Sequence, residues 1–353
     1  MEEDCHKLKR VYMSGADKRM ALQRVNRGRP SGSTNIVPEV EILNEAAILT
    51  ENWCLFELGS CLGQPISTLR WLAQRKLIKN NFFCNPCNRH FTLNAYKRTV
   101  DGYCWYCKEC KRRRSVRDGS FFTRSKLSFK QIILFIYCWS RDMQLKDIQH
   151  EARLSSINHT LVDWGNFCRD VCEVEIETNP NVVGGINNDG TAIVVEIDES
   201  KFFHRKYHRG QWRPGHWVFG GIERGSGKCF LVEVPDRTAE TLQDMILRYI
   251  LPGTHIVSDG WASYGGIENI QNGIYSHAVV VHERNFVDPL DDEVHTQNVE
   301  NLWMRVKRKL RRQFGTSEDL FTSYLHEFIW RQRFKNFPLF SAFISCISRQ
   351  YPA

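Results

Sequence analysis

Two acidic residues stand at the ends of apolar segments, where their carboxylates could hold a metal ion. Asp198 follows the segment IVVEI, and Asp259 follows HIVS and precedes a glycine. β-Branched residues favour strands, so both acids are expected at strand ends. If the strands are adjacent, the two anions raise each other's pKa unless a cation lies between them. Oxygen ligands at a partly open site favour Mg²⁺ or Mn²⁺ over zinc.

A third carboxylate is expected on a helix that follows these strands. Glu300 lies in HTQNVENLWMRVKRKLRRQF (295–314), whose apolar residues recur at helical spacing. It falls between the apolar stripe and the basic face, where it could bind a metal at the edge of the core. Glu196 is a candidate helper, whereas alternation places Glu199 on the opposite face of its strand. The alternatives for the third position lie in a polar loop: Asp291, Asp292 and Glu293.

Four cysteines form two pairs with the spacing of metal-binding knuckles. Cys84 and Cys87 make one C-x2-C pair, and Cys107 and Cys110 make the other. Four thiolates in two knuckles suit tetrahedral Zn²⁺, held by a ribbon of short strands. Either Cys104 or His90 could replace one of these ligands. The N-terminal sequence MEEDCHKLKR lacks an apolar signal region, so a reducing compartment is expected and the 13 cysteines do not predict disulfides.

Basic residues are concentrated in a chain with a net charge of +8. The runs KRRRSVR (111–117) and RVKRKLRR (305–312) suit a polyanion such as DNA, or each forms a solvated face. Residues 27–30, RGRP, resemble the core of an AT-hook, which binds the minor groove, or they belong to a plain linker. The DNA contacts expected from these segments are Arg27, Arg29, Arg112, Arg113, Arg114, Arg305, Arg308 and Arg311.

The elements that must position these residues change type along the chain. Residues 126–178 predict three helices, two of them joined like a helix-turn-helix that binds DNA, and strands begin near residue 191. No apolar run is long enough to predict a membrane span. We expect the following regions: a flexible basic arm (1–45), a helical segment (46–80), a zinc ribbon (81–125), a helix-turn-helix-like domain (126–178), an α/β catalytic domain (188–340) and a C-terminal tail (341–353).

Two aspartates on strands and a glutamate on a later helix, in the order strand, hairpin, helix, strand, resemble the DDE transposases with an RNase H-like core. The segments VEIDESKF, DGWASY and HTQNVENLWMRVKR resemble the Merlin superfamily of cut-and-paste transposases and their bacterial insertion-sequence relatives. Those proteins also carry a zinc ribbon and a helical segment before the core. The resemblance covers roughly residues 80 to 335.

The resemblance implies roles for particular residues. Asp198, Asp259 and Glu300 would bind Mg²⁺ or Mn²⁺, and Lys307 would contact a phosphate. His295 and Asn298 would support the site, while Trp303 would stack a splayed base or pack in the core. The chemistry implied is cleavage at the ends of a DNA element and joining of the 3′-OH ends to target DNA.

The resemblance also implies partners and a location. The partners would be double-stranded DNA of the element ends and target, and further copies of the chain in a homodimer or larger oligomer. The location would be the nucleus. Two alternatives stay open: a domesticated transposase that regulates by binding DNA, and a metal-dependent nuclease that cuts without joining.

Overall fold

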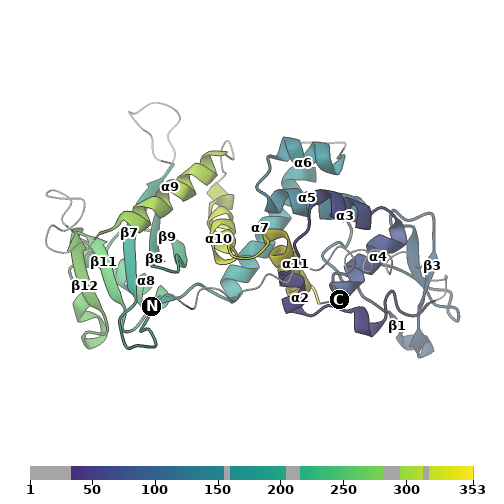
Figure 1. The fold of residues 1–353 in the computed structure, drawn as a ribbon, viewed down its shortest axis with the longest axis horizontal. Coiled ribbons are helices and arrows are strands. Elements are labelled where there is room, and N and C mark those ends of the chain that lie inside the picture. Colours follow the sequence, from purple (N-terminus) through teal and green to yellow (C-terminus); the bar gives the residue numbers. More distant parts are fainter. Residues whose placement is uncertain (1–32, 155–159, 204–214, 281–294, 313–317, 353) are drawn as a thin grey trace, which may run out of the picture. The chain divides into compact units, whose positions relative to one another are not determined.

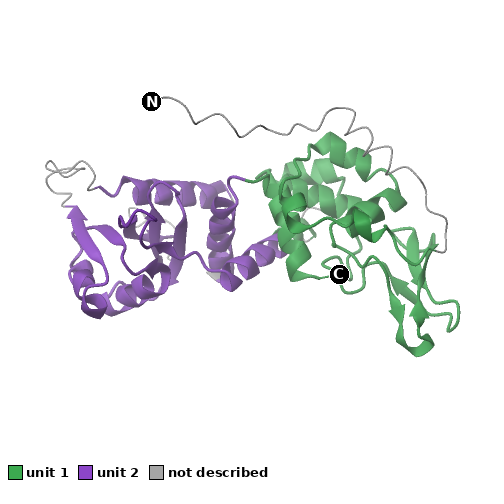
Figure 2. Ribbon diagram, turned by 60° about the horizontal axis from the view of Figure 1, so that its bottom comes forward, with its two compact units in different colours: residues 1–165, 337–353 green, residues 166–336 purple. Residues whose placement is uncertain are grey.

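The computed structural model describes residues 33–352 except 155–159, 204–214, 281–294 and 313–317. The chain divides into two compact units, one made of residues 1–165 with 337–353 and the other of residues 166–336 (Figure 2). The second unit is therefore inserted, in sequence, between two segments of the first. In the described residues, no helix is long and apolar enough to cross a membrane.

The first unit begins with a segment that packs where the sequence predicted part of a flexible arm. Ile36 and Val37 are buried, and their N–H groups donate to the carbonyl and the side chain of Asn80, both at 2.9 Å. Residues 33–45 therefore belong to the folded unit, because two apolar side chains and their backbone anchor them. Short helices follow: η1 (Glu39–Glu41), α2 (Glu45–Leu49), α3 (Leu55–Cys61) and α4 (Pro65–Gln74).

The cysteine knuckles lie in a region of short antiparallel strands. One two-stranded sheet surrounds the first knuckle, and the second knuckle follows the central strand of a three-stranded sheet. Trp105, which is fully buried, provides a core for this small region. The strands are β1 (Phe83–Cys84) with β2 (Arg89–His90), and β3 (Thr92–Ala95), β4 (Tyr103–Tyr106) and β5 (Arg113–Ser115).

Three helices follow the ribbon. They are α5 (Phe129–Ser140), α6 (Leu145–Ala152) and α7 (Thr160–Thr178). Ser128 and Gln131 form a capping box that begins α5. The predicted turn near Ser155 and Ser156 lies outside the described residues. Helix α7 passes from the first segment of the first unit, which ends at residue 165, into the second unit.

The end of the chain is a helix rather than the expected tail. Helix α11 (Leu339–Gln350) belongs to the first unit and buries most of its side chains there. Phe340 stacks on Trp71 with ring centroids 6.2 Å apart, and Phe343 lies 5.0 Å from Trp139. Burying a large apolar side chain contributes about 1.5–3 kcal/mol, so this helix is part of the core of the first unit.

The second unit is built on a five-stranded mixed sheet (Figure 1). Strands β7, β8 and β9 form an antiparallel meander, and β11 and β12 continue the sheet on the other side of β7, parallel to it. The order β12-β11-β7-β8-β9 is the arrangement of an RNase H-like core, as the resemblance implied. The strands are β7 (Val194–Phe202), β8 (His216–Glu223), β9 (Cys229–Val234), β11 (His255–Asp259) and β12 (Ser276–Val280).

Helices cover both faces of this sheet. On one face, Leu242 and Ile246 of α8 (Ala239–Tyr249) join the core formed by Val195 and Ile197 of β7. On the other face, α9 (Gln297–Arg312) packs on β7 and β8, and α10 (Phe321–Arg333) packs on β9 (Figure 1). A small parallel pair lies apart from the main sheet: β6 (Val183–Gly184) and β10 (Ile250–Leu251).

Candidate functional site

Asp198 and Asp259 lie on neighbouring strands at the same end of the sheet. Strands β7 and β11 run parallel, and Val257 pairs with Glu196 in their register. Asp259 and Asp198 are each two positions further along, so alternation turns both toward the face covered by α9. The structure therefore brings these two predicted residues together.

The surroundings of the Asp198 carboxyl disfavour its charged form. Its pKa is raised to about 7, chiefly because burial removes it from water and then because Glu199 and Asp259 add negative charge. The indole N–H of Trp303 donates to Asp198 Oδ2 at 2.9 Å, which opposes the rise. A cation bound between desolvated, neighbouring carboxylates stabilises their charged forms. This set of oxygen ligands therefore fits Mg²⁺ or Mn²⁺.

The Asp259 carboxylate is fixed by the turn that follows its strand. Its Oδ1 accepts a hydrogen bond from the backbone N–H of Trp261 at 3.0 Å. The side chain thus caps the end of β11 with one oxygen. This bond holds the carboxylate beside the position of Asp198, as a metal ligand at a strand end requires.

Glu300 lies on the first turn of α9, at the edge of the face that meets β7. Trp303 and Lys307 are one and two turns further along that face, and they bond to Asp198 and to Ser200 Oγ, the latter at 2.6 Å. Glu300 itself is exposed, and Thr296 donates to its Oε1 at 3.4 Å. The oxygens of the three acids do not all lie within 4.8 Å of one another.

Glu196, the candidate helper, anchors α9 to the sheet. Its side chain is fully buried and accepts hydrogen bonds from the backbone N–H groups of Asn298 and Val299 at 2.8 and 3.1 Å. It also pairs with Arg224 Nε at 2.7 Å. A carboxylate at a helix N-terminus satisfies the N–H groups that lack intrahelical partners. Glu196 thus determines where Glu300 stands instead of facing the site as a ligand.

The two predicted support residues are part of this anchor. The Asn298 side-chain amide donates to Glu196 Oε1 at 2.6 Å, and the carbonyl of His295 accepts from Arg224 Nη2 at 2.7 Å. His295 Nδ1 lies 3.3 Å from the same carboxylate oxygen. Both residues therefore act on the start of α9. The alternative ligands Asp291, Asp292 and Glu293 lie outside the described residues.

Trp303 is buried where a stacking role would need it exposed. Its side chain is 5% exposed and makes edge contact with Phe202, with ring centroids 6.0 Å apart. Gly220, directly opposite Asp198 on β8, leaves room for the ring: an added Cβ would lie 2.7 Å from it. This position corresponds to core packing, the other of the two roles considered for Trp303.

The three arginines of α9 that were predicted to contact DNA differ in their exposure. Arg305 is partly buried and donates to Gln332 Oε1 of α10 at 3.3 Å. Arg308 and Arg311 are exposed. Arg305 thus joins two helices, while the other two arginines remain on the surface, where a phosphate backbone could reach them.

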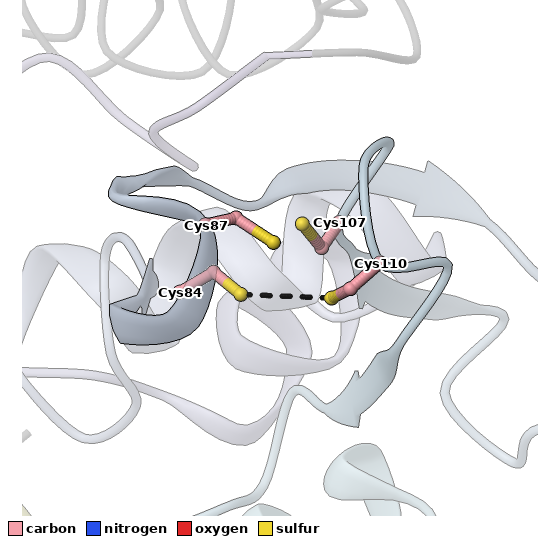
Figure 3. A group of neighbouring side chains, drawn as sticks. All are labelled: Cys84, Cys87, Cys107 and Cys110. Carbon is pink, nitrogen blue, oxygen red and sulfur yellow. Dashed lines mark hydrogen bonds between the residues drawn. The ribbon is translucent and has the colours of Figure 1, made fainter.

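The four predicted zinc ligands meet in the ribbon (Figure 3). Their sulfur atoms all lie within 4.8 Å of one another, and Cys84 Sγ and Cys110 Sγ are 3.7 Å apart. The backbone N–H of Cys110 donates to the Cys107 thiol and lowers its pKa to about 7, which favours the thiolate that binds metal. This donor set fits a tetrahedral Zn²⁺. Neither Cys104, which is buried, nor His90, which is exposed, belongs to the group.

The basic run after the ribbon contains both surface and structural arginines. Arg112, Arg113 and Arg114 are exposed, whereas Arg117 is buried and makes a bidentate pair with Asp101 at 2.6 and 2.7 Å. Arg117 also donates to the carbonyl groups of Ser125 and Leu127, so it supports the chain between ribbon and helices. The predicted contacts Arg27 and Arg29 lie outside the described residues.

A family model for the ISXO2-like transposase domain matches residues 182–333, which hold the five-stranded sheet and helices α8, α9 and α10. This part of the chain is similar to the ISXO2-like transposase domain. The match confirms the relationship to the DDE transposases that the three sequence segments predicted. The transposase domain contains Asp198, Asp259 and Glu300.

One curated relative is the male abnormal protein mab-31 of Caenorhabditis elegans. It is 22% identical over 278 residues, covering 72% of this chain and 64% of the relative. The chain therefore spans less than two thirds of the length of that relative.

Solved structures similar to this chain include retroviral integrases. The catalytic core domain of BIV integrase is 15% identical, with a TM-score of 0.28, and covers 39% of this chain and 80% of that one. A chain of the simian T-cell lymphotropic virus intasome in complex with PP2A regulatory subunit B56 gamma is also 15% identical, with a TM-score of 0.27. It covers 50% of this chain and 58% of that one.

Two groups near the transposase domain were not predicted from the sequence. Glu173 and Glu177 of α7 lie with His326 of α10, their ligand atoms all within 4.8 Å of one another. On the face of β7 opposite α9, the buried carboxylate of Glu199 accepts from Arg237 Nη1 at 3.3 Å and from the Tyr264 hydroxyl. The four-residue spacing of the two glutamates was visible in the sequence, but their partners lie far along the chain.

Proposed function

We propose that this chain is a metal-dependent DNA transposase that cuts DNA at the ends of its element and joins the 3′-OH ends to target DNA. The observation that carries this proposal is the pair of aspartates on adjacent strands, with the pKa of Asp198 raised to about 7, beneath the helix that carries Glu300. Such a pair has little structural value without a cation. The transposase family of residues 182–333 supports DNA as the substrate.

The residues of the site have separate tasks in this proposal. Asp198, Asp259 and Glu300 would hold the divalent cations, which when bound lower the pKa of a water and stabilise the leaving oxygen of a phosphodiester. Trp303 keeps the Asp198 carboxylate oriented through its indole N–H. Lys307, held at Ser200 on the same strand, supplies a positive charge beside the site for a phosphate.

Surfaces outside the site would hold the DNA. Arg308 and Arg311 on α9 and Arg112 to Arg114 after the ribbon are exposed and lie in basic runs. Phosphate contacts of this kind give affinity without sequence preference. We further propose that the cysteine group binds structural Zn²⁺, that two or more copies hold the element ends together, and that the protein acts in the nucleus.

A strand-joining assay tests the proposal. The full-length protein would be incubated with Mg²⁺, a target plasmid and a duplex ending in the inverted repeats that flank its gene. We expect nicking at the repeat end and transfer of that end into the plasmid. Cleavage without transfer would overturn the proposal in favour of a nuclease. Tight binding of the repeats without cleavage in either Mg²⁺ or Mn²⁺ would indicate a domesticated DNA-binding protein.

A further inference from the structure

A partly exposed tryptophan follows the strand that carries Asp259. Trp261 is 41% exposed and follows Asp259 by two residues. Its backbone N–H donates to Asp259 Oδ1 at 3.0 Å, which fixes the main chain of Trp261 beside that carboxylate. A large aromatic surface is costly to expose to water, and core packing does not account for this one.

The indole of Trp261 is also held in one orientation. The guanidinium carbon of Arg237 lies 4.3 Å from the centroid of the Trp261 ring and 3.9 Å from that of Trp217. The planar guanidinium group of Arg binds aromatic faces by cation–π contact, so its contact with both rings favours one orientation of the Trp261 indole. Trp261 therefore has one contact with a fixed cation and retains exposed surface.

Arg237 is itself fixed by the residues under the sheet end. Its Nη1 donates to Glu199 Oε1 at 3.3 Å, and its carbonyl accepts from Ser263 Oγ at 2.8 Å. The Tyr264 hydroxyl donates to the other oxygen of Glu199. Glu199 is the neighbour of Asp198 in sequence and points to the opposite face of β7. The same two strands thus orient both the carboxylates and the aromatic group.

We propose that Trp261 is a stacking platform for one unpaired nucleobase of the DNA end, an inference that rests on the proposed action on DNA. The aromatic face and the nearby carboxylates match the two parts of a nucleotide beside the scissile phosphate, its base and its phosphodiester. Stacking accepts any base, since every base has a π face.

Paired DNA duplexes that differ in a single base test this inference. One duplex carries a single unpaired nucleotide at its end, and the other carries an abasic residue at the same place, with the unpaired position moved along the end in a series. We expect wild-type protein to bind the base-containing DNA about 5- to 150-fold more tightly at one position. Trp261→Ala should bind both DNAs equally at that position.

Further variants separate stacking from folding. Trp261→Phe should retain part of the preference, whereas Trp261→Leu, which keeps an apolar side chain without a π face, should lose it. Arg237→Lys should weaken the preference, because the ammonium group cannot stack as a plane. Phe56→Ala removes another exposed aromatic side chain, in α3, and should leave the preference unchanged. Melting temperatures of all variants would show that the fold is kept.

The outcomes distinguish this inference from the proposed function. Wild-type protein that joins strands but shows no preference for a base at any position would overturn the platform and leave the function standing. A preference that survives in Trp261→Ala and Trp261→Leu would assign the base to another residue. A protein that binds neither DNA would contradict the proposed function itself.

Discussion

The cysteine group and the carboxylate group differ in how far apart their residues lie in the sequence. Cys84, Cys87, Cys107 and Cys110 come from one short region and already lie within 4.8 Å of one another. Asp198, Asp259 and Glu300 come from two strands and a distant helix and are not gathered so closely. A metal in the ribbon would stabilise the fold, while the fold of the second unit brings the acids together against their repulsion.

The largest effect in this comparison is expected from a variant of the cysteine group that no longer binds metal. Cys107→Ser should remove the metal, and the ribbon should unfold, because structural zinc contributes about 10–16 kcal/mol in small domains. Metal analysis and circular dichroism of the purified variant measure both. Cys104→Ser is the control: Cys104 is buried in β4 outside the group, so the metal should stay. Loss of metal in this control would place Cys104 among the ligands.

The acids should behave in the opposite way, losing activity without losing the fold. Asp198→Asn, Asp259→Asn and Glu300→Gln should each reduce cleavage and joining by about 100-fold or more. Double variants should lose little further activity, since one missing ligand already breaks the site. Strand joining, end binding and melting temperature on the same proteins measure this. A Glu300→Gln protein with full activity would reject Glu300 as the third ligand.

Two buried carboxyl groups of the second unit should respond oppositely to pH. The raised pKa of Asp198, about 7, means that the folded protein binds a proton more tightly than the unfolded chain. The unfolding free energy should therefore fall as pH rises from about 4 to 7, by up to about 1.4 kcal/mol per pH unit. Urea unfolding at several pH values without added Mg²⁺ measures this slope. Asp198→Asn should flatten it, and an unchanged slope would show that another group titrates.

Glu327 provides the internal contrast for that experiment. Burial alone would raise its pKa, but Lys309 at 3.0 Å and Arg331 at 2.8 Å lower it to about 2. A carboxyl with a lowered pKa stabilises the fold above its unfolded pKa, and that stability is lost as pH falls toward 2. The two acids thus titrate in separate ranges, which allows their contributions to be distinguished.

The smallest expected effect tests the support of Asp198. Gly220→Ala places a Cβ 2.7 Å from the Trp303 ring, so the unfolding free energy should fall by about 1–3 kcal/mol. Displacement of Trp303 should also weaken joining, because its indole orients Asp198. Gly59→Ala in α3 meets no heavy atom within 4 Å and should leave joining unchanged. Denaturant unfolding and the joining assay compare them, and a neutral Gly220→Ala would contradict the tight contact.

Local patterns were sufficient to predict several parts of the site. Alternation and strand ends predicted that Asp198 and Asp259 meet, and knuckle spacing predicted the cysteine group. Helical spacing placed Glu300, Trp303 and Lys307 on one face. Each of these patterns lies within a single strand, helix or pair of knuckles, whereas the adjacency of the two strands was an assumption that the structure bears out.

Contacts between segments that are distant in sequence could not be predicted from such local patterns. The anchor of α9 joins Glu196 to Asn298, and the Trp303 position depends on a glycine in another strand. The segment 33–45 was predicted to be part of an arm because residues 1–45 are polar and basic and include the Gly-, Pro- and Ser-rich stretch NRGRPSGSTN. Helix α11 was missed for a different reason: its partners, such as Trp71 and Trp139, lie in the first unit, far from it in sequence.

Helix α11 has a consequence for the order in which the protein is made. Its side chains complete the core of the first unit, yet it follows every element of the second unit in the sequence. The second unit, residues 166–336, is therefore synthesised before that core can close. A premature stop codon just after residue 336 would spare every acid of the site and damage the N-terminal module instead. Translation through α11 is therefore needed before the core of the first unit is complete.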